Sequence, residues 1–440
     1  MSVLTGSPAF AAALDAARPE RQGRVTAAVG LGVEVAGLSP RVGELLELGA
    51  ERETVAEVVA VRTGAASCLP LTGGAGLAAG APARRRRSAP LAPVGPGLVG
   101  RVVDGLGRPI DGRGPLDRVE RVPAEQTAPA PLDRARIDEP LQTGVRAIDA
   151  LTPLGRGQRM GLFAGSGVGK SSLLSMIARG TDAARSVIAL VGERGREVRE
   201  FLEDDLGAEG LARSIVVVAT SDEPALMRLR AARLATRIAE HERDAGRDVV
   251  LMMDSLTRVA MAQREIGLSA GEPPATRGYP PSTFSLLARL LERAGTASRG
   301  SITGLYTVLV DGDDHNEPVA DAARSILDGH LVLERSLAIA GHFPSIDVLA
   351  SISRVASKVQ PAETAADATA LRRALAAQRR AQDLIDVGAY QAGANPLVDA
   401  AIAQSGAIDA FLQQGMAETT PLETTRGRLA ELARLLGGAR

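Results

Sequence analysis

The chain has 440 residues, a formal net charge of −1 at pH 7, 45% hydrophobic and 23% charged residues. This balance is typical of a globular protein of roughly two to four domains and excludes a disordered chain. The near-neutral charge provides no general attraction to nucleic acid, and no apolar run is long enough to span a membrane. The single cysteine, Cys68, excludes an internal disulfide and fits a reducing cytosol.

The first predicted domain is a small β-barrel. Between residues 23 and 93, short β-branched runs alternate with glycine turns, as at 24–29, 32–35 and 57–61. Short strands at close, regular spacing are typical of an all-β barrel or sandwich. A run of four arginines, 84–87, interrupts this pattern. We expect a basic surface loop there, with contact to acidic lipid or to a protein partner as the alternative.

The next predicted domain is a parallel sheet covered by helices. Residues 94–158 hold turns punctuated by glycine and proline, and we expect a connector there. Beyond residue 159 the predicted strands are 187–191, 215–219, 249–253 and 302–310, and the predicted helices are 197–206, 225–245, 256–266 and 284–294. Apolar strands separated by helices indicate a parallel sheet with both faces covered.

A glycine-rich loop follows a further apolar strand at the start of this domain. Its residues are Gly165, Ser166, Gly167, Val168, Gly169, Lys170, Ser171 and Ser172. Glycines let successive N–H groups turn toward phosphate oxygens, the lysine supplies a charge for the β- and γ-phosphates, and the Ser171 hydroxyl can hold Mg²⁺. The helix that opens at Ser171 adds the positive end of its dipole. Although Ala164 replaces the first glycine of the usual motif, the loop predicts binding of a nucleoside triphosphate with Mg²⁺.

Two acidic residues are expected at the same edge of the sheet. Glu193 follows the strand 187–191, and Asp254 ends the strand 249–253. Ligands of such sheets bind beyond the carboxyl ends of the strands, and an aspartate in this place holds Mg²⁺ or its waters in nucleotide hydrolases. Either carboxylate alone could be a solvated strand end. Together with the phosphate-binding loop they predict a hydrolytic site.

The last part of the chain is predicted to be a helical domain. After about residue 364 only helical patterns remain, at 365–385, 397–404 and 422–436. The predicted organisation is an N-terminal segment 1–22, a β-barrel 23–93, a nucleotide-binding core with its connector 94–364, and a helical domain 365–440.

Three further segments resemble the rotary ATPase family, which includes the ATP synthase α and β subunits. They are the glutamate motif at 192–198 (GERGREV), the loop at 271–282 (GEPPATRGYPPS) and the run at 344–353 (PSIDVLASIS). The sequences of these segments are most similar to those of the flagellar type III export branch of that family. The resemblance covers about residues 23–359 and continues more loosely to the C-terminus. It implies an α/β fold: a RecA-like P-loop core with a parallel sheet, preceded by a small β-barrel and followed by a helical domain.

The resemblance also implies roles for individual residues. Glu193 would orient and polarise the attacking water. Arg354 would be the arginine finger that reaches into a neighbouring subunit's site. Phe343 would stack on adenine, although without the family context a core phenylalanine would be the simpler interpretation. The implied catalytic set is Lys170, Glu193, Asp254 and Arg354.

Other positions carry weaker implications. Arg194 and Glu197 would lie near the phosphates or at the subunit boundary. Two positions depart from the family pattern, Asp311 where Glu is usual and Glu334 where Ser usually precedes Arg335. Neither is a primary catalytic position, so they bear only on local detail of the subunit interface.

Since one chain carries both Glu193 and Arg354, the resemblance implies a homohexamer of identical sites that hydrolyses Mg-ATP to energise protein export. The implied partners are a stator-like regulator at the N-terminal segment, a central stalk protein, a membrane export gate, and export substrates with their chaperones, but no nucleic acid. The implied location is cytoplasmic, at the inner face of the membrane export apparatus.

Four alternatives remain open. The injectisome ATPase of virulence-type secretion would share every motif. The catalytic subunit of a proton-driven synthase would need a separate partner that donates the arginine. A hexameric RNA translocase stacks bases on aromatic side chains of its barrel, yet residues 23–93 contain no Phe, Tyr or Trp. A structural subunit with an inactive site is opposed by the intact set of Lys170, Glu193 and Asp254.

Overall fold

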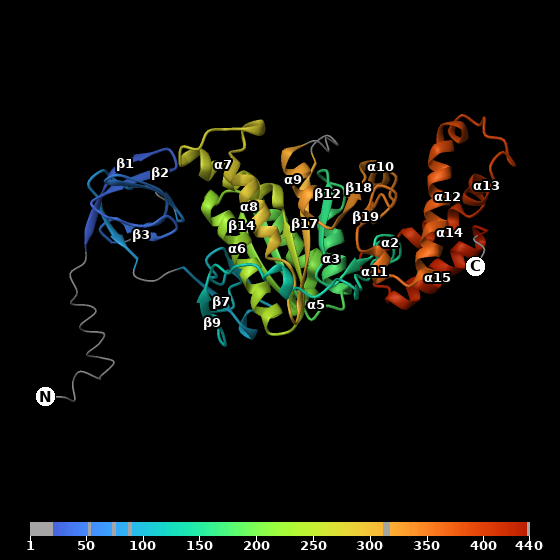
Figure 1. The fold of residues 1–440 in the computed structure, drawn as a ribbon, viewed down its shortest axis with the longest axis horizontal. Coiled ribbons are helices and arrows are strands. Elements are labelled where there is room, and N and C mark those ends of the chain that lie inside the picture. Colours follow the sequence, from blue (N-terminus) through green and yellow to red (C-terminus); the bar gives the residue numbers. More distant parts are fainter. Residues whose placement is uncertain (1–20, 52–53, 73–75, 87–89, 311–316, 438–440) are drawn as a thin grey trace. The chain divides into compact units, whose positions relative to one another are not determined.

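The computed structural model describes residues 21–51, 54–72, 76–86, 90–310 and 317–437 (Figure 1). They form two compact units. One comprises the residues up to Pro90 together with Ile266–Glu272, and the other comprises Leu91–Glu265 and the residues from Pro273 onward. Among the described residues, none of the helices has the length and apolarity needed to cross a membrane. The predicted N-terminal segment falls outside the description up to residue 20, as do Arg87 and Asp311.

The first unit contains a closed six-stranded barrel with the strand order β1-β2-β5-β4-β3-β6. Its strands are β1 Gln22–Val29, β2 Gly32–Ala36, β3 Leu45–Leu48, β4 Thr54–Arg62, β5 Ala65–Pro70 and β6 Pro82–Arg85. Alternate residues point inward, so Val33 and Val35 of β2 join Val58 and Cys68 in the barrel core. Burial raises the pKa of the Cys68 thiol to about 12, which keeps it protonated and unreactive.

The arginine run differs from its prediction as a loop. Arg84 and Arg85 belong to β6, the strand that closes the barrel against β1 and β3. Arg85 also makes an ion pair with Glu44 at 2.7 Å. The closing strand has one buried apolar side chain, Ala83, so it is held by backbone pairing and carries no hydrophobic alternation that a sequence pattern could reveal.

The second unit is built on a nine-stranded sheet with the order β19-β18-β12-β17-β15-β13-β14-β8 and with β16 beside β17. Its strands are β8 Val102–Asp104, β12 Arg159–Ala164, β13 Arg185–Glu193, β14 Ser214–Thr220, β15 Asp248–Asp254, β16 Gly295–Thr296, β17 Ser301–Leu309, β18 Gly329–Leu333 and β19 Ile352–Ser353. All neighbouring pairs are parallel except β18–β19 and β16–β17. The carboxyl ends of β12, β13 and β15 therefore lie at one edge.

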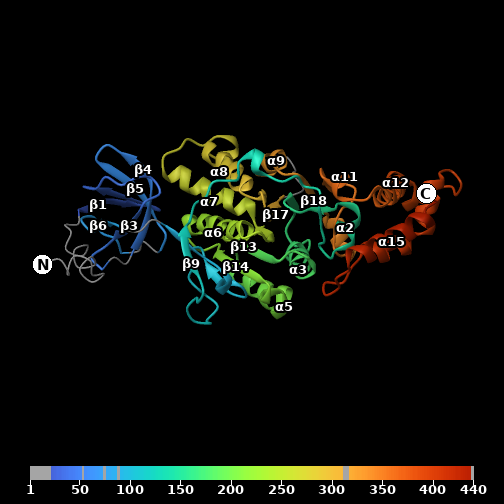
Figure 2. The ribbon, with the colours of Figure 1, turned by 60° about the horizontal axis from the view of Figure 1, so that its bottom comes forward.

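Helices cover both faces of this sheet. They are α3 Lys170–Gly180, α4 Gly195–Glu200, a π-helical turn Phe201–Leu206, α5 Gly207–Ala212, α6 Ala225–Asp244, α7 Leu256–Ser269, α8 Pro281–Glu292, α9 Pro318–Ile326 and α10 Arg335–Ile339. Ile188 and Val216 face one core cluster together with Leu173 of α3 and Phe201. Helix α6 packs on β13, β14 and β15 from the other side (Figure 2).

The predicted connector contributes more to the core than expected. Its strand β8 pairs with β14 in parallel and extends the main sheet. It also forms β7 Leu91–Val94 with β9 Glu120–Pro123, β10 Pro140–Leu141 with β11 Leu154–Gly155, and helix α2 Arg146–Leu151. Three residues, Val102–Asp104, are too few to show a strand pattern against the surrounding turns.

The C-terminal part is helical, as predicted, with α11 Ala356–Val359, α12 Ala362–Asp386, α13 Pro396–Ala403, α14 Ser405–Leu412 and α15 Leu422–Leu435. Helix α14 is not predicted by the sequence pattern. Buried Arg146 of α2 joins this part to the core, since its side chain donates to the Phe411 carbonyl at 2.9 Å and to Thr420 at 3.0 Å. The predicted fold class, a barrel, a parallel-sheet core and C-terminal helices, is thus confirmed. The three boundaries between the four predicted segments stay predictions.

Candidate nucleotide-binding site

The glycine-rich loop joins β12 to α3 and forms one wall of a cavity of about 650 Å³. Gly167 and Gly169 have φ angles of +76° and +89°, a left-handed conformation that side chains with a Cβ rarely adopt. Gly169 is the N-cap residue of α3, so the unpaired amides of the first helical turn face the cavity. This combination is a ready anion site, since both the amides and the helix dipole favour phosphate.

The cavity brings together most of the predicted site residues. Its lining includes Gly165, Ser166, Gly167, Gly169, Lys170, Ser171, Ser172, Glu193, Arg194, Glu197 and Asp254. The phosphate loop thus meets the carboxyl ends of β13 and β15, as the order of parallel strands requires. Arg194 is mostly exposed at the rim, where it pairs with Glu197 at 3.2 Å.

Lys170 stands between the two acidic residues. Its Nζ lies 2.7 Å from Oδ1 of Asp254 and 3.7 Å from Oε1 of Glu193. Burial alone would lower the pKa of Lys170, but the two carboxylates outweigh it and raise that pKa, so the ammonium stays charged. Lys358 is the chain's other lysine, while arginine supplies the remaining side-chain cations apart from histidine. A compact ammonium is the form that suits a point contact with a phosphate.

Asp254 is fixed by a neighbouring strand. The Thr307 hydroxyl on β17 donates to its Oδ1 at 2.7 Å, and the Asp254 side chain is 4% exposed. Oδ1 of Asp254 thus accepts a hydrogen bond from the Thr307 hydroxyl and forms the ion pair with Lys170. These two interactions hold the carboxylate at the sheet edge.

Glu193 is electrostatically distinct from Asp254. Burial is the largest influence and raises the pKa of Glu193 to about 6, with Asp254 adding to the rise, while Lys170 and Arg258 oppose it. Its buried Oε1 makes no hydrogen bond within the described residues. The pairing register of β13 shifts between Val191 and Glu193, which re-aims the side chain at the strand end. A desolvated carboxylate with a free acceptor and a pKa near neutrality is suited to general-base work.

A divalent cation fits this site only together with a nucleotide. In the described part of the chain, no group of three or more His, Cys, Asp or Glu side chains could hold a metal by itself. Mg²⁺ prefers one or two protein oxygens supplemented by phosphate oxygens and waters. Ser171 and Asp254, both lining the cavity, and Oε1 of Glu193, which accepts no hydrogen bond within the described residues, match that requirement.

Phe343 lies beside the loop and Val168 belongs to it, but neither residue lines the cavity. A Cβ on Gly169 would come within 3.6 Å of the Phe343 ring, which is 46% exposed. Such exposure argues against a core phenylalanine and leaves a ring face beside the phosphate loop. Val168 is buried, and its carbonyl accepts a 2.6 Å hydrogen bond from the Ser345 hydroxyl. This bond ties the Phe343 segment to the loop.

Arg354 lies outside the cavity of its own chain. It follows β19, its side chain is exposed, and its Nη2 donates to the Arg324 carbonyl at 3.4 Å. Its assignment as a finger stays a prediction, as do the roles of the other site residues.

Three further cavity residues carry polar groups that the sequence motifs do not single out: Thr257, Arg258 and Glu317. Tyr279, which also lines the cavity, belongs to the loop at 271–282 that resembles the family. Arg258 lies four residues beyond Asp254, on the first turn of α7. This short sequence separation from the end of β15 is the signal that could have predicted a place for Arg258 in the cavity. A Cβ on Gly192 would lie 2.9 Å from the Cβ of Arg258, and the glycine before Glu193 therefore admits this arginine.

One departure from the family pattern has a local explanation. Glu334 precedes helix α10 as its N-cap, and its carboxylate accepts from the Ser336 hydroxyl at 3.2 Å. Either a serine or a carboxylate can cap a helix start, so the replacement is structurally conservative.

Comparison with known proteins gives two family matches. Residues 144–353 match the ATP synthase alpha/beta family, nucleotide-binding domain, and residues 360–431 match the T3SS EscN ATPase C-terminal domain. The chain is 50% identical over 417 residues to the flagellum-specific ATP synthase of Bacillus subtilis, covering 94% of this chain and 95% of that protein. It is 49% identical to a type 3 secretion system ATPase of Xanthomonas euvesicatoria, covering 92% of each.

A solved structure shares this fold. The assembled ATPase EscN of the enteropathogenic E. coli type III secretion system superimposes with a TM-score of 0.87 at 42% identity, covering 93% of this chain and all of that one. The same values hold for EscN in complex with its central stalk EscO.

Proposed function

Since this chain belongs to the ATP synthase alpha/beta family and is an ATPase, we propose that it energises flagellar type III protein export as a homohexamer. The flagellar assignment follows the names of its relatives, which include flagellum-specific ATP synthases from Bacillus subtilis, Pseudomonas aeruginosa and Salmonella typhimurium at 48–50% identity. High coverage of both chains supports transfer of the whole activity.

One observation carries the catalytic proposal: Lys170, Asp254 and a desolvated Glu193 converge on a single cavity beside the phosphate loop. Lys170 leaves its carboxylate partners to contact the β- and γ-phosphates. Glu193 accepts a hydrogen bond from the attacking water through Oε1, which has no hydrogen-bond partner among the described residues, and polarises that water. The amides of the loop and of the α3 N-terminus receive the negative charge that develops on the phosphoryl oxygens.

Mg²⁺ would be held by the Ser171 hydroxyl and, directly or through water, by Asp254. When bound, it neutralises charge on the β- and γ-phosphate oxygens. The hydrogen bond from Thr307 orients the Asp254 carboxylate for that contact. Phe343 offers its exposed ring to adenine, and Arg194 lies at the rim near the phosphates.

Arg354 completes the site of an adjacent copy. The Arg354 side chain is exposed and does not line the cavity of its own chain, and both observations support this role. The similar ATPase EscN, whose structure was solved in an assembled form, supports it as well. An arginine supplied in trans is worth about 10³–10⁵ in rate, so assembly would switch the enzyme on.

The remaining partners are proposed from the relatives. The EscN–EscO complex supports a central stalk protein as a partner of the ring. A stator-like regulator at the N-terminal segment, a membrane export gate, and cargo with chaperones complete the set. The enzyme would act in the cytoplasm, peripherally at the export apparatus.

Mixed rings test the trans arginine. Arg354→Ala retains a whole pocket but lacks the donor arginine, whereas Lys170→Ala retains the donor arginine but lacks a working pocket. Each variant is therefore expected to be inactive alone. In an equal, random mixture of the two, we expect recovery of at most about a quarter of wild-type activity, because only correctly ordered junctions are repaired. Absence of recovery in verified mixed rings would contradict the trans assignment. Concentration-independent activity of a confirmed monomer would contradict the ring.

Two alternatives have direct discriminating tests. The injectisome assignment is favoured by the EscN-type C-terminal domain and by the EscN structural match. Complementation of motility in a flagellar ATPase deletion strain, compared with complementation of secretion in an injectisome deletion strain, separates the two. An RNA translocase would show ATPase activity stimulated several-fold by polynucleotide and declining with salt, and we expect no stimulation.

A further inference from the structure

The backbone that carries Arg354 is held by two antiparallel strands, β18 and β19, which are joined by a long connection containing α10 and are called the hairpin below. Strand β19 pairs antiparallel with β18, with Ser353 opposite Gly329. The Arg354 amide donates to the Asp328 carbonyl at 3.0 Å, while its side chain extends from the surface. The base of the side chain is therefore fixed, although the guanidinium is exposed.

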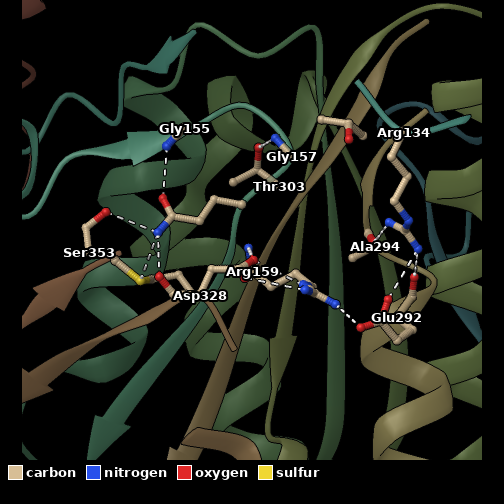
Figure 3. A network of polar contacts seen from close by, with 12 residues as sticks. Arg134, Gly155, Gly157, Arg159, Glu292, Ala294, Thr303, Asp328 and Ser353 are labelled. Atoms are coloured by element: carbon tan, nitrogen blue, oxygen red, sulfur yellow. Dashed lines mark hydrogen bonds and ion pairs between the residues drawn. The ribbon is translucent and has the colours of Figure 1, made fainter. Parts of the chain in front are cut away.

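A buried glutamine joins this hairpin to the phosphate-loop strand. Gln158, fully buried, directly precedes β12. Its Oε1 accepts from the Gly155 amide at 2.9 Å, and its Nε2 donates to the Asp328 carbonyl at 3.0 Å and to the Ser353 hydroxyl at 3.1 Å (Figure 3). One side-chain amide thus contacts Ser353 of β19 and Asp328, the residue directly before β18.

The turn that contains Gln158 also supports the residue on the other side of Arg354. A Cβ on Gly155 would lie 3.4 Å from Val355 and 3.0 Å from Val359, so the hairpin exit packs closely on this glycine. Ser353 and Val355, the two neighbours of Arg354, therefore both depend on the segment from Gly155 to Gln158.

An ion-pair network secures the residue to which Gln158 donates. The Asp328 carboxylate accepts from the Arg159 amide at 3.0 Å and from its Nε at 3.1 Å. Arg159 in turn donates to Glu292 at the end of α8, and Arg134 donates to the Glu292 carbonyl at 2.6 Å (Figure 3). Asp328 is thus anchored to β12 and α8 independently of the glutamine.

We propose that Gln158 is a positioning residue for Arg354, which sets where the arginine of one subunit enters the pocket of the next. The inference rests on the proposed trans role of Arg354. Nothing in the motifs that define the phosphate loop calls for a glutamine directly before its strand, and the amide nitrogen of this glutamine donates to both the Asp328 carbonyl and the Ser353 hydroxyl. Loss of the hydrogen bond to Ser353 removes a side-chain support of the residue before Arg354 while Asp328 stays anchored, and a misplacement of about 1 Å can cost about 10²-fold in rate.

The test uses mixed rings in which the donor of the arginine and the owner of the pocket are different chains. The reference pair is Lys170→Ala as donor with Arg354→Ala as owner. Adding Gln158→Met to the donor removes the hydrogen bonds to Asp328 and Ser353, together with the one from the Gly155 amide, at nearly constant side-chain length. We expect ATPase recovery about tenfold below the reference pair. Adding Gln158→Met to the owner instead leaves the donated arginine untouched, and recovery should stay within about twofold of the reference.

The outcomes separate the two proposals. No recovery in the reference pair overturns the trans arginine and this inference together. A normal reference pair with an equally active Gln158→Met donor overturns the positioning role alone. Equal losses with donor and owner also overturn it, because they indicate general damage to the fold.

Thr303→Val is the matched control. Thr303 is buried in the same network and accepts from the Gly157 amide at 2.9 Å, but no hydrogen bond links its side chain to the hairpin among the described residues. Its effect should be the same in donor and owner. Ser353→Ala is a milder second variant, and we expect about a threefold loss in the donor alone. If Gln158→Met does not fold, an unchanged Ser353→Ala donor overturns the proposal.

Discussion

The nucleotide cavity and the Arg354 hairpin belong to the same unit but treat charge differently. In the cavity, Lys170 is 13% exposed and is paired in advance with two carboxylates. On the hairpin, the Arg354 side chain is exposed and only its backbone is tightly held. A cation that contacts a phosphate of its own chain can be desolvated with its counter-charges. A cation intended for another chain has to remain accessible, so its position is set through the main chain.

The largest expected effect tests the hairpin side of this comparison. Arg354→Ala should lower kcat by about 10³-fold or more and leave Mg-ATP affinity nearly unchanged, because the guanidinium stabilises charge that develops in the transition state. Turnover and equilibrium binding of a fluorescent ATP analogue measure the two quantities. Lys358→Ala removes another exposed cation four residues later and should have little effect on either. A matching loss of affinity in Arg354→Ala would place the arginine in ground-state binding.

The next largest effect distinguishes the roles of two residues within the cavity, Glu193 and Lys170. Glu193→Gln should lower kcat by about 10²–10⁴-fold and keep nucleotide affinity, since water activation belongs to the transition state. Lys170→Ala should lose affinity as well as turnover, because the ammonium contacts ground-state phosphates. The same binding and turnover measurements apply, with Glu200→Gln on α4 as a control. Equal loss of affinity in the two variants would remove Glu193 from the catalytic role.

The pH dependence should follow from the burial of Glu193. Its pKa is raised to about 6, and only the ionised form can accept a proton from water. We expect kcat/KM to be constant above that pH and to fall about tenfold per pH unit below it. A profile recorded on assembled protein, with oligomeric state checked at each pH, tests this expectation. An acid limb near the ordinary glutamate value of 4.5 would contradict it.

The smallest expected effect concerns stability. A carboxyl group whose pKa is raised on folding destabilises the folded state when it is ionised. The penalty is fully present above about pH 6 and disappears as pH falls below the unfolded value of 4.5. Glu193→Gln should therefore raise the melting temperature at pH 8, on the order of 1–2 °C, and have less effect at pH 4. A lower melting temperature at pH 8 would show that the pairing with Lys170 outweighs desolvation.

Much of the site could be predicted because its chemistry depends on short continuous segments. The phosphate loop, the acidic end of β15 and the glutamate motif after β13 each carry their own local signal, and a parallel sheet necessarily brings their strand ends to one edge. Arg258 and Glu317 lack such signals, since they reach the cavity only through the packing of α7 and of the start of α9. Strands β6 and β8 could not be predicted from a hydrophobic pattern either. Strand β6 has a single buried apolar side chain, and β8 has only three residues.

The sequence by itself determined the fold class and showed that the glycine-rich loop, Glu193 and Asp254 belong at one edge of the sheet, because each stands in its own short segment beside a strand, while the roles of these residues and of Arg354 stay predictions. Only the tertiary structure decided how those residues are tuned. Desolvation raises the pKa of Glu193 because of what surrounds it, and Gln158 meets Ser353, 195 residues away, only after β12 and the β18–β19 hairpin have joined the same sheet. Burial and long-range hydrogen bonds arise from packing between distant segments, which no local pattern contains.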